Sequence, residues 1–265
     1  MTHQMAELSW SGLEERIAGG AVVLLPVGAN ESHGPHLPLG TDRICACGFA
    51  AEIANRIDAV VAPEIPWGFR SQIKTGGGSH WVGNIGLDAE VLVGLVRATI
   101  RELAIKGMTR IAIVNGHYEN VWFITEGCEL AVRDLDAQPG GELIIQTASW
   151  WDMVSDDDLA AIFPNPPASI EYEHGALLET SIMMSMRPDL VATDKFPQHG
   201  FKVFPPYDVF PQDPARANET GSLATSNGAN AEAGAELVRL IADRMADHIR
   251  TELEAGPAHD TQSES

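Results

Sequence analysis

Alternating apolar and mixed stretches divide the chain into segments with strand-like and helix-like patterns. Short apolar runs typical of buried strands are AVVLLPV at 21–27, RIAIVNG at 110–116 and ELIIQTASW at 142–150, and AVVAPEIPWG begins as another. Apolar residues at helical spacing predict helices at about 42–57 and 231–254, and in LDAEVLVGLVRATIRELAIKG, ENVWFITEGCELAVRDL, SDDDLAAIF and EHGALLETSIMMSM. Strands and helices therefore alternate, which predicts an α/β fold with a mainly parallel sheet covered by helices on both faces.

The length of the chain sets the number of domains. Its 265 residues, 45% hydrophobic and 20% charged, suffice for one large domain, which we expect at 1–255, with a disordered tail at 256–265. No run reaches the roughly 18 apolar residues of a membrane helix. The opening MTHQMAELSW lacks the basic start and apolar stretch of a secretory signal. We therefore expect a cytoplasmic protein without a membrane partner.

Charge and cysteine content argue against a nucleic-acid-binding protein and against a disulfide-rich or cysteine-based zinc protein. Thirty-seven acidic residues against 17 lysines and arginines give a net charge of -20, which disfavours binding to nucleic acid phosphates. One hypothesis for this acidity is adaptation to a salty cytoplasm. Three irregularly spaced cysteines are too few for a disulfide framework or a cysteine-based zinc site, and we interpret them as small buried residues.

Side chains that can bind metals follow two separate predicted strands. Glu31, His33 and Asp42 come after the strand at 21–27, and His117 and Glu119 come directly after the strand at 110–116. Ligand sites of parallel sheets form where the strands end. In extended backbone, residues two apart project to the same side, so each His and Glu pair can offer a nitrogen and an oxygen ligand.

Asp42 changes this interpretation from one ion to two. Imidazole and carboxylate together suit Zn, Mn or Co, and a fifth ligand with two oxygens can bridge two ions about 3.5 Å apart. Either pair alone is also typical of ordinary loop or capping residues. Their joint occurrence after two strands favours a metal site.

The same segments resemble the creatininase family. LPVGANESHGPHLPLGTD is similar to its metal-binding segment, VNGHYEN to the form found in creatininases proper, EYEHGALLETS to its third motif, and FPPYDVFPQDPAR to a late segment. The resemblance extends from about Leu8 to about Arg250. It implies a three-layer α/β sandwich around a short parallel sheet, two divalent ions (Zn, Mn or both) per chain, and a homo-oligomer, commonly a hexamer.

The resemblance also implies a role for individual residues. Glu31, Asp42 and His117 would bind one ion, and His33, Asp42 and Glu119 the other. His174 corresponds to the proton-handling histidine, and Glu119 is a second catalytic candidate. Substrate contacts are implied for Thr75, Tyr118, Trp151, Ile170 and Tyr172. The implied reaction is hydrolysis of a cyclic amide, interconverting creatinine and creatine through a hydroxide that bridges the ions, with the small molecule as the partner.

One position departs from the family pattern and keeps alternatives open. Ile170 stands where creatininase presents a tryptophan that closes over the ligand, and nearby Tyr172 can compensate. A relative acting on another lactam, a formamide or a related carbonyl substrate therefore remains an alternative. A nucleotide-binding module lacks its motif, because GGGSHW has Trp81 where the last glycine is required. A non-catalytic metal-binding protein would not need His174.

Overall fold

A computed structural model describes residues 2–167, 169–170 and 173–254. Its centre is a parallel sheet in the order β2-β1-β3-β4. The strands are β1 (Val22–Val27), β2 (Ala59–Val61), β3 (Arg110–Asn115) and β4 (Ile144–Ser149). Tyr172 and the tail at 256–265, for which the sequence made predictions, lie outside the described residues. The α/β prediction with a parallel sheet is confirmed.

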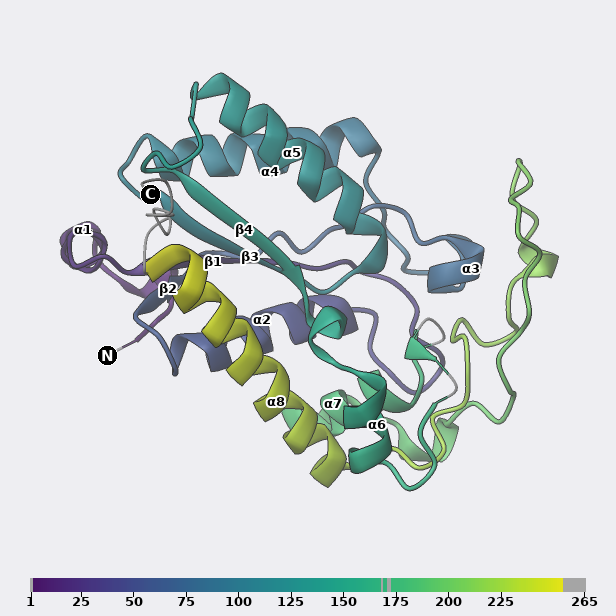
Figure 1. The fold of residues 1–265 in the computed structure, drawn as a ribbon. Helices are drawn as coiled ribbons and strands as arrows, with labels where there is room; N and C mark the ends of the chain where they lie inside the picture. Colours follow the sequence, from purple (N-terminus) through teal and green to yellow (C-terminus); the bar gives the residue numbers. More distant parts are fainter. Residues whose placement is uncertain (1, 168, 171–172, 255–265) are drawn as a thin grey trace, which may run out of the picture.

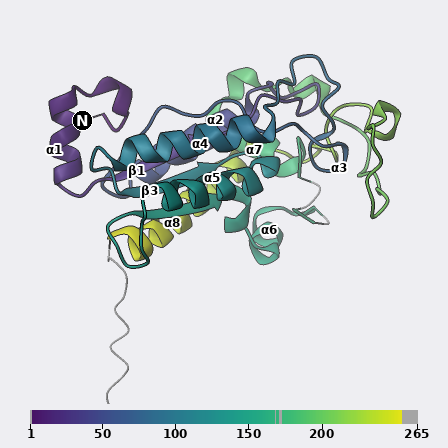
Figure 2. The same cartoon turned by 90° about the horizontal axis from the view of Figure 1, so that it is seen from above.

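Helices cover both faces of the sheet (Figures 1 and 2). One face carries α2 (Thr41–Ala54), α7 (Leu177–Met186) and α8 (Ala231–Ile249); the other carries α4 (Ala89–Ala104) and α5 (Val121–Asp134). The side chains of β1 alternate between these layers, since Val22 and Leu24 join the first core while Val23 and Leu25 join the second. Burial on both faces explains why β1 is apolar throughout.

The remaining elements are shorter. They are α1 (Trp10–Ala18), α3 (Ile73–Gly76), α6 (Asp156–Ile162), the 3-10 turns Met5–Glu7, Tyr118–Asn120, Trp150–Met153, Pro188–Leu190, Thr193–Lys195 and Pro214–Arg216, and a π-helical turn, Arg250–Glu254. Within the described residues, no helix combines the length and the apolar character needed to cross a membrane.

A long segment between α7 and α8, residues 197–217, extends away from the body of the molecule (Figure 1). We call it the strap. Lys202 ties its two ends together, because Nζ donates hydrogen bonds to the carbonyls of Arg216 and Ala217 at 2.7 and 2.9 Å. Gln212 donates to Gln72 at 2.7 Å, and Lys74 pairs with Asp208 at 3.1 Å. The strap is therefore held against α3.

The sequence missed two features of this arrangement. It did not predict α1, whose buried side is limited to partly covered residues such as Leu13 and Ile17. It also placed Trp150 on a strand, whereas β4 ends at Ser149 and Trp150 begins a 3-10 turn. Trp150 serves packing, because it is 2% exposed and stacks on Phe49.

Candidate metal centre

Seven titratable side chains meet where β1 and β3 end. Glu31 and His33 lie in the loop after β1, Asp42 lies in the first turn of α2, and His117 and Glu119 follow β3 directly. His174 precedes α7, and Glu179 lies in its first turn. All seven are buried. The five residues that the sequence grouped as ligands therefore lie in one region of the molecule.

Ligand-type atoms converge in two groups that share Asp42. In the first, His117 Nδ1 lies 3.0 Å from Glu31 Oε1 and 3.1 Å from Asp42 Oδ2. In the second, His33 Nε2 lies 2.9 Å from Asp42 Oδ1 and 3.6 Å from Glu179 Oε2. The three atoms of each group lie within 4.8 Å of one another. Asp42 turns one oxygen toward each group, as a bridging carboxylate does.

Several of these buried atoms lack a hydrogen-bond partner, which tests whether ions fit here. Glu31 Oε2, His33 Nε2 and Asp42 Oδ2 have none. Buried polar atoms without partners are rare and destabilising. A cation in each group would satisfy them, and mixed nitrogen and oxygen donors suit Zn or Mn. The residues present therefore fit two divalent ions.

Backbone carbonyls orient all three histidines. His33 Nδ1 lies 3.3 Å from the Glu31 carbonyl, His117 Nε2 lies 3.0 Å from the Phe69 carbonyl, and His174 Nε2 lies 2.8 Å from the Ser32 carbonyl. A carbonyl oxygen can only accept, so these nitrogens carry hydrogen. The other nitrogen of each ring faces the cluster and would offer its lone pair to a bound ion, as in many metal sites.

The charges of the cluster favour a cation at its centre. Burial alone would lower the pKa of both His33 and His117, yet the surrounding carboxylates raise it well above its ordinary value. Burial would raise the pKa of Glu31, but His117 and His174 outweigh burial and lower it. The carboxylates thus stabilise positive charge, which metal ions supply when bound.

Glu119 lies at the edge of this cluster. Its Oε1 accepts hydrogen bonds from the backbone N–H of Gln72 at 2.7 Å and from the hydroxyl of Thr75 at 2.6 Å. Its Oε2 lies 3.4 Å from His117 Nε2. Burial and the neighbouring Glu31 raise the pKa of Glu119. Among the described residues, the three-membered ligand groups include Glu179 and do not include Glu119.

His174 sits beside both groups. Its Nδ1 lies 3.6 Å from Glu31 Oε1, and its ring packs on His33 with the centroids 4.2 Å apart. Glu31, His33 and His174 form a third set of converging ligand atoms. Gly175 sets this position: its φ is +59°, and a Cβ there would lie 2.7 Å from the His33 carbonyl oxygen.

A cavity of about 380 Å³ opens onto the cluster. Four predicted substrate-contacting residues line it: Thr75, Tyr118, Trp151 and Ile170. Tyr118 and Trp151 form one wall, with ring centroids 6.1 Å apart. The strap adds Val203, Phe204 and Pro205. The strap thus forms part of the cavity wall.

The sequence did not single out two polar residues of the wall, Lys74 and Glu173. Burial raises the pKa of Glu173 to about 8. Its position next to His174 in EYEHG was the available signal. Among the described residues, the ligand groups include neither of two further histidines from nearby loops, His36 and His80. His36 is buried and contacts Thr180 and Ser226 through Nε2 at 2.8 and 2.9 Å, whereas His80 is exposed.

Comparisons with known proteins show the family of the chain. The family model for creatininase (creatinine amidohydrolase) matches residues 6–249. The chain is 40% identical over 250 residues to the creatinine amidohydrolase of Pseudomonas putida, covering 94% of this chain and 96% of that protein. It is 30% identical over 238 residues to the mycofactocin precursor peptide peptidase of Mycolicibacterium smegmatis, covering 84% of each.

Solved structures show the same fold. A creatininase structure described as the Mn form has a TM-score of 0.91 at 39% identity, covering 96% of this chain and 99% of that chain. A glutamine variant of creatininase, described as Zn-Zn type, has a TM-score of 0.92 at 38% identity with the same coverage. The same kind of variant complexed with creatine has a TM-score of 0.90 at 38% identity, covering 95% and 98%.

Proposed function

The chain belongs to the creatinine amidohydrolase family of metal-dependent hydrolases, and we propose that its substrate is creatinine, whose ring it opens to creatine. The observation that carries this proposal is a pair of ligand groups sharing Asp42 at the base of a cavity with flat aromatic walls. Tyr118 and Trp151 suit a planar five-membered ring. A related protein binds creatine.

For the ions, we propose a ligand set that differs from the sequence-based one at a single residue. Glu31, Asp42 and His117 would hold the first ion, and His33, Asp42 and Glu179 the second. The 3.6 Å separation of His33 Nε2 from Glu179 Oε2 supports Glu179. Glu119 already accepts two hydrogen bonds at the cavity wall, so we assign it to the reaction rather than to an ion.

When bound, the ions would polarise the substrate carbonyl and acidify a water molecule. Side chains of this chain would transfer the proton and position the water. His174 presents Nδ1 toward the cavity, where this atom can take a proton from water and deliver it to the departing ring nitrogen. A bond forms between water oxygen and the carbonyl carbon, the ring C–N bond breaks, and the proton ends on nitrogen. Glu119, fixed by Thr75, can hold a second water molecule.

The test is to remove the metal with a chelator, restore Mn or Zn separately, and assay creatinine with a panel of lactams, formamides and short peptides. We expect creatinine turnover only after metal is restored. Turnover of another amide without turnover of creatinine would refute the proposal that creatinine is the substrate. A second candidate function is hydrolysis of a larger amide. The observation that favours it is Ile170, which lines the cavity in place of a flat lid.

Metal content tests the ligand set separately. Wild type should hold two ions per chain, Asp42→Asn should lose both, and Glu179→Gln should lose one. Glu119→Gln should keep two and lose activity. His174→Gln should also keep two ions while losing most activity. Loss of an ion in Glu119→Gln, with two retained in Glu179→Gln, would restore the sequence-based assignment.

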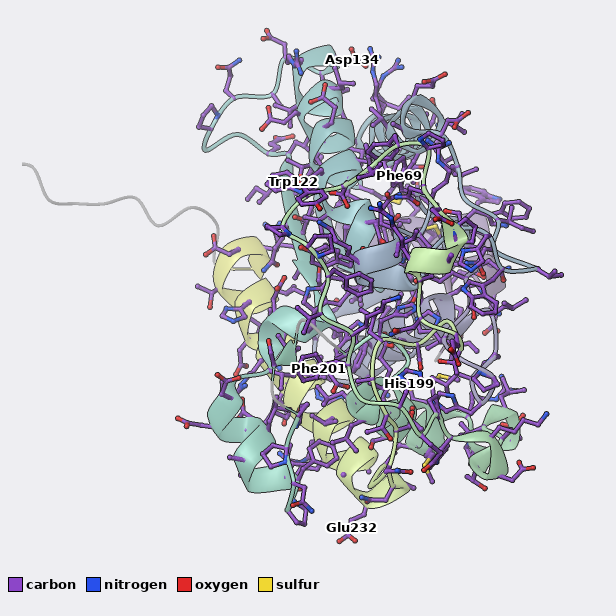
Figure 3. All side chains as sticks on the ribbon, turned by 90° about the vertical axis from the view of Figure 1, so that its right-hand side faces the viewer. Phe69, Trp122, Asp134, His199, Phe201 and Glu232 are labelled. Atoms are coloured by element: carbon purple, nitrogen blue, oxygen red, sulfur yellow. The ribbon has the colours of Figure 1, made fainter. Side chains whose placement is uncertain are left out.

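We also propose that the chain forms a homo-oligomer, as the family resemblance implies. Support comes from the strap, where Val203, Tyr207 and Phe210 are 80%, 61% and 74% exposed. Figure 3 shows the face on which the strap lies, with His199 and Phe201 labelled on the strap and Trp122 at the start of α5. Exposed apolar groups of this kind mark contact surfaces. Light scattering should give a mass above the 28.5 kDa of one chain, and a monomer would refute this proposal.

A further inference from the structure

One carboxyl group in the cavity wall has no role in the reaction as described so far. Glu173 lines the cavity although it is only 6% exposed. Its Oε2 accepts a hydrogen bond from the backbone N–H of Leu178 at 2.7 Å, in the first turn of α7. This bond fixes the direction of the side chain and uses one of its two oxygens.

No cation of the protein neutralises Glu173 within the described residues. Lys74, the lysine of the cavity wall, pairs with Asp208 of the strap at 3.1 Å. Burial without a cationic partner is costly for the charged form of Glu173, and it raises the pKa to about 8 although the Leu178 N–H partly offsets it. A ligand that brings N–H groups or positive charge into the cavity would remove that cost.

The other carboxylates of the cavity are already committed. Glu31, Asp42 and Glu179 belong to the two ligand groups, and Glu119 accepts hydrogen bonds from Gln72 and Thr75. Among the described residues of the wall, Glu173 is the acidic one that remains for the substrate. Trp151 and Ile170 line the same cavity, so a flat nitrogen-rich group beside Glu173 would also have apolar surface to pack on.

We propose that Glu173 determines specificity by accepting hydrogen bonds from the amidine or guanidine N–H groups of the substrate. This inference rests on the proposed function, because creatinine is a cyclic guanidine. When its ring C–N bond breaks, the released nitrogen takes one proton of the attacking water, and the open guanidine takes the other as the new carboxyl group ionises, so that it becomes a guanidinium. Positive charge therefore develops as the reaction proceeds, and a carboxylate binds a guanidinium more tightly than a neutral amidine.

The experiment compares creatinine with 1-methylhydantoin, which has the same ring and the same scissile bond but an oxygen in place of the exocyclic nitrogen. Glu173→Gln keeps an oxygen for the Leu178 N–H and replaces the other acceptor by an amide donor. We expect kcat/KM for creatinine to fall about 100-fold while that for 1-methylhydantoin is unchanged or rises. Glu173→Asp, which keeps the charge, should retain part of the preference for creatinine. Both variants should hold two ions.

An equal fall for both substrates would show that Glu173 only supports α7, and no change for either would show that the substrate does not reach it. Each outcome overturns the inference. If the variants do not fold, a competition assay with the wild-type protein supplies the test. With any amide that the wild type turns over as the substrate, methylguanidine should inhibit at least about tenfold more strongly than methylurea. Equal inhibition refutes the role of Glu173, whereas absent creatinine turnover with strong guanidine inhibition refutes the proposed substrate alone.

Discussion

Gly116 lies where the two ligand-bearing segments approach each other, so one added methyl group there tests the geometry of the site. A Cβ at Gly116 would lie 2.3 Å from the carbonyl oxygen of Asp42 and 3.2 Å from the Cβ of Ala46. Neither atom belongs to a flexible side chain that can rotate away. Gly116→Ala must therefore push the end of β3, with His117, away from the start of α2, with Asp42.

The expected magnitude follows from two opposing effects. Overpacking of a rigid contact costs about 1–3 kcal/mol. Replacing glycine stabilises by up to about 1 kcal/mol through the unfolded state. We expect a net loss of about 1–2 kcal/mol in the free energy of unfolding of the metal-free protein. Displacing two ligands should also weaken ion binding about tenfold or more.

Gly94 provides the matched control. It lies inside α4, and a Cβ there would meet no atom within 4 Å. Gly94→Ala should therefore stabilise the protein by about 0.5–1 kcal/mol and leave ion binding unchanged. The assay is urea unfolding with chelator at fixed protein concentration, followed by titration with Mn. Equal stabilities and equal ion affinities for the two variants would refute the reasoning.

Further predictions concern packing, pH and the cavity wall. Trp150→Ala should cost about 3–5 kcal/mol in urea unfolding, and Trp150→Phe much less, because the Trp150 Nε1 has no partner to lose; equal losses would contradict this. Arg244 donates to both oxygens of Asp158 at 2.6 and 2.9 Å and lowers the pKa of that carboxyl. A folded pKa below the unfolded value of about 4 means that the stabilisation is complete above pH 4 and is lost on acidification. Because Arg244 is exposed, we expect Asp158→Asn to lower the free energy of unfolding by about 1 kcal/mol at pH 7. This difference from wild type should therefore shrink below pH 4, and a difference that stays constant would argue against the ion pair. Thr75→Ala should lower kcat about tenfold while two ions are retained. Thr75→Ser should not lower kcat, because serine keeps the hydroxyl that donates to Glu119. Equal activities of the two variants would show that this hydrogen bond is dispensable.

Local pattern was enough to predict the sheet, most helices and the region of the site. Apolar runs such as 21–27 must be buried wherever they lie, and the ligand-type residues directly after β1 and β3 are carried to one edge by the parallel strands. Asp42 was also within reach of the sequence, because its helix starts close to the end of β1. These features depend on residues that are near one another along the chain.

The proposal that Glu179 rather than Glu119 holds an ion rests on tertiary structure. The sequence predicted one helix through EHGALLETSIMMSM, on which His174 and Glu179 need not share a face. Instead α7 begins at Leu177, and Gly175 adopts a positive φ that turns His174 toward Glu31. Glu179 then reaches His33 from the first turn of α7. Where a helix begins and which loop it packs against are set by contacts between distant segments, and no periodicity within the segment encodes them.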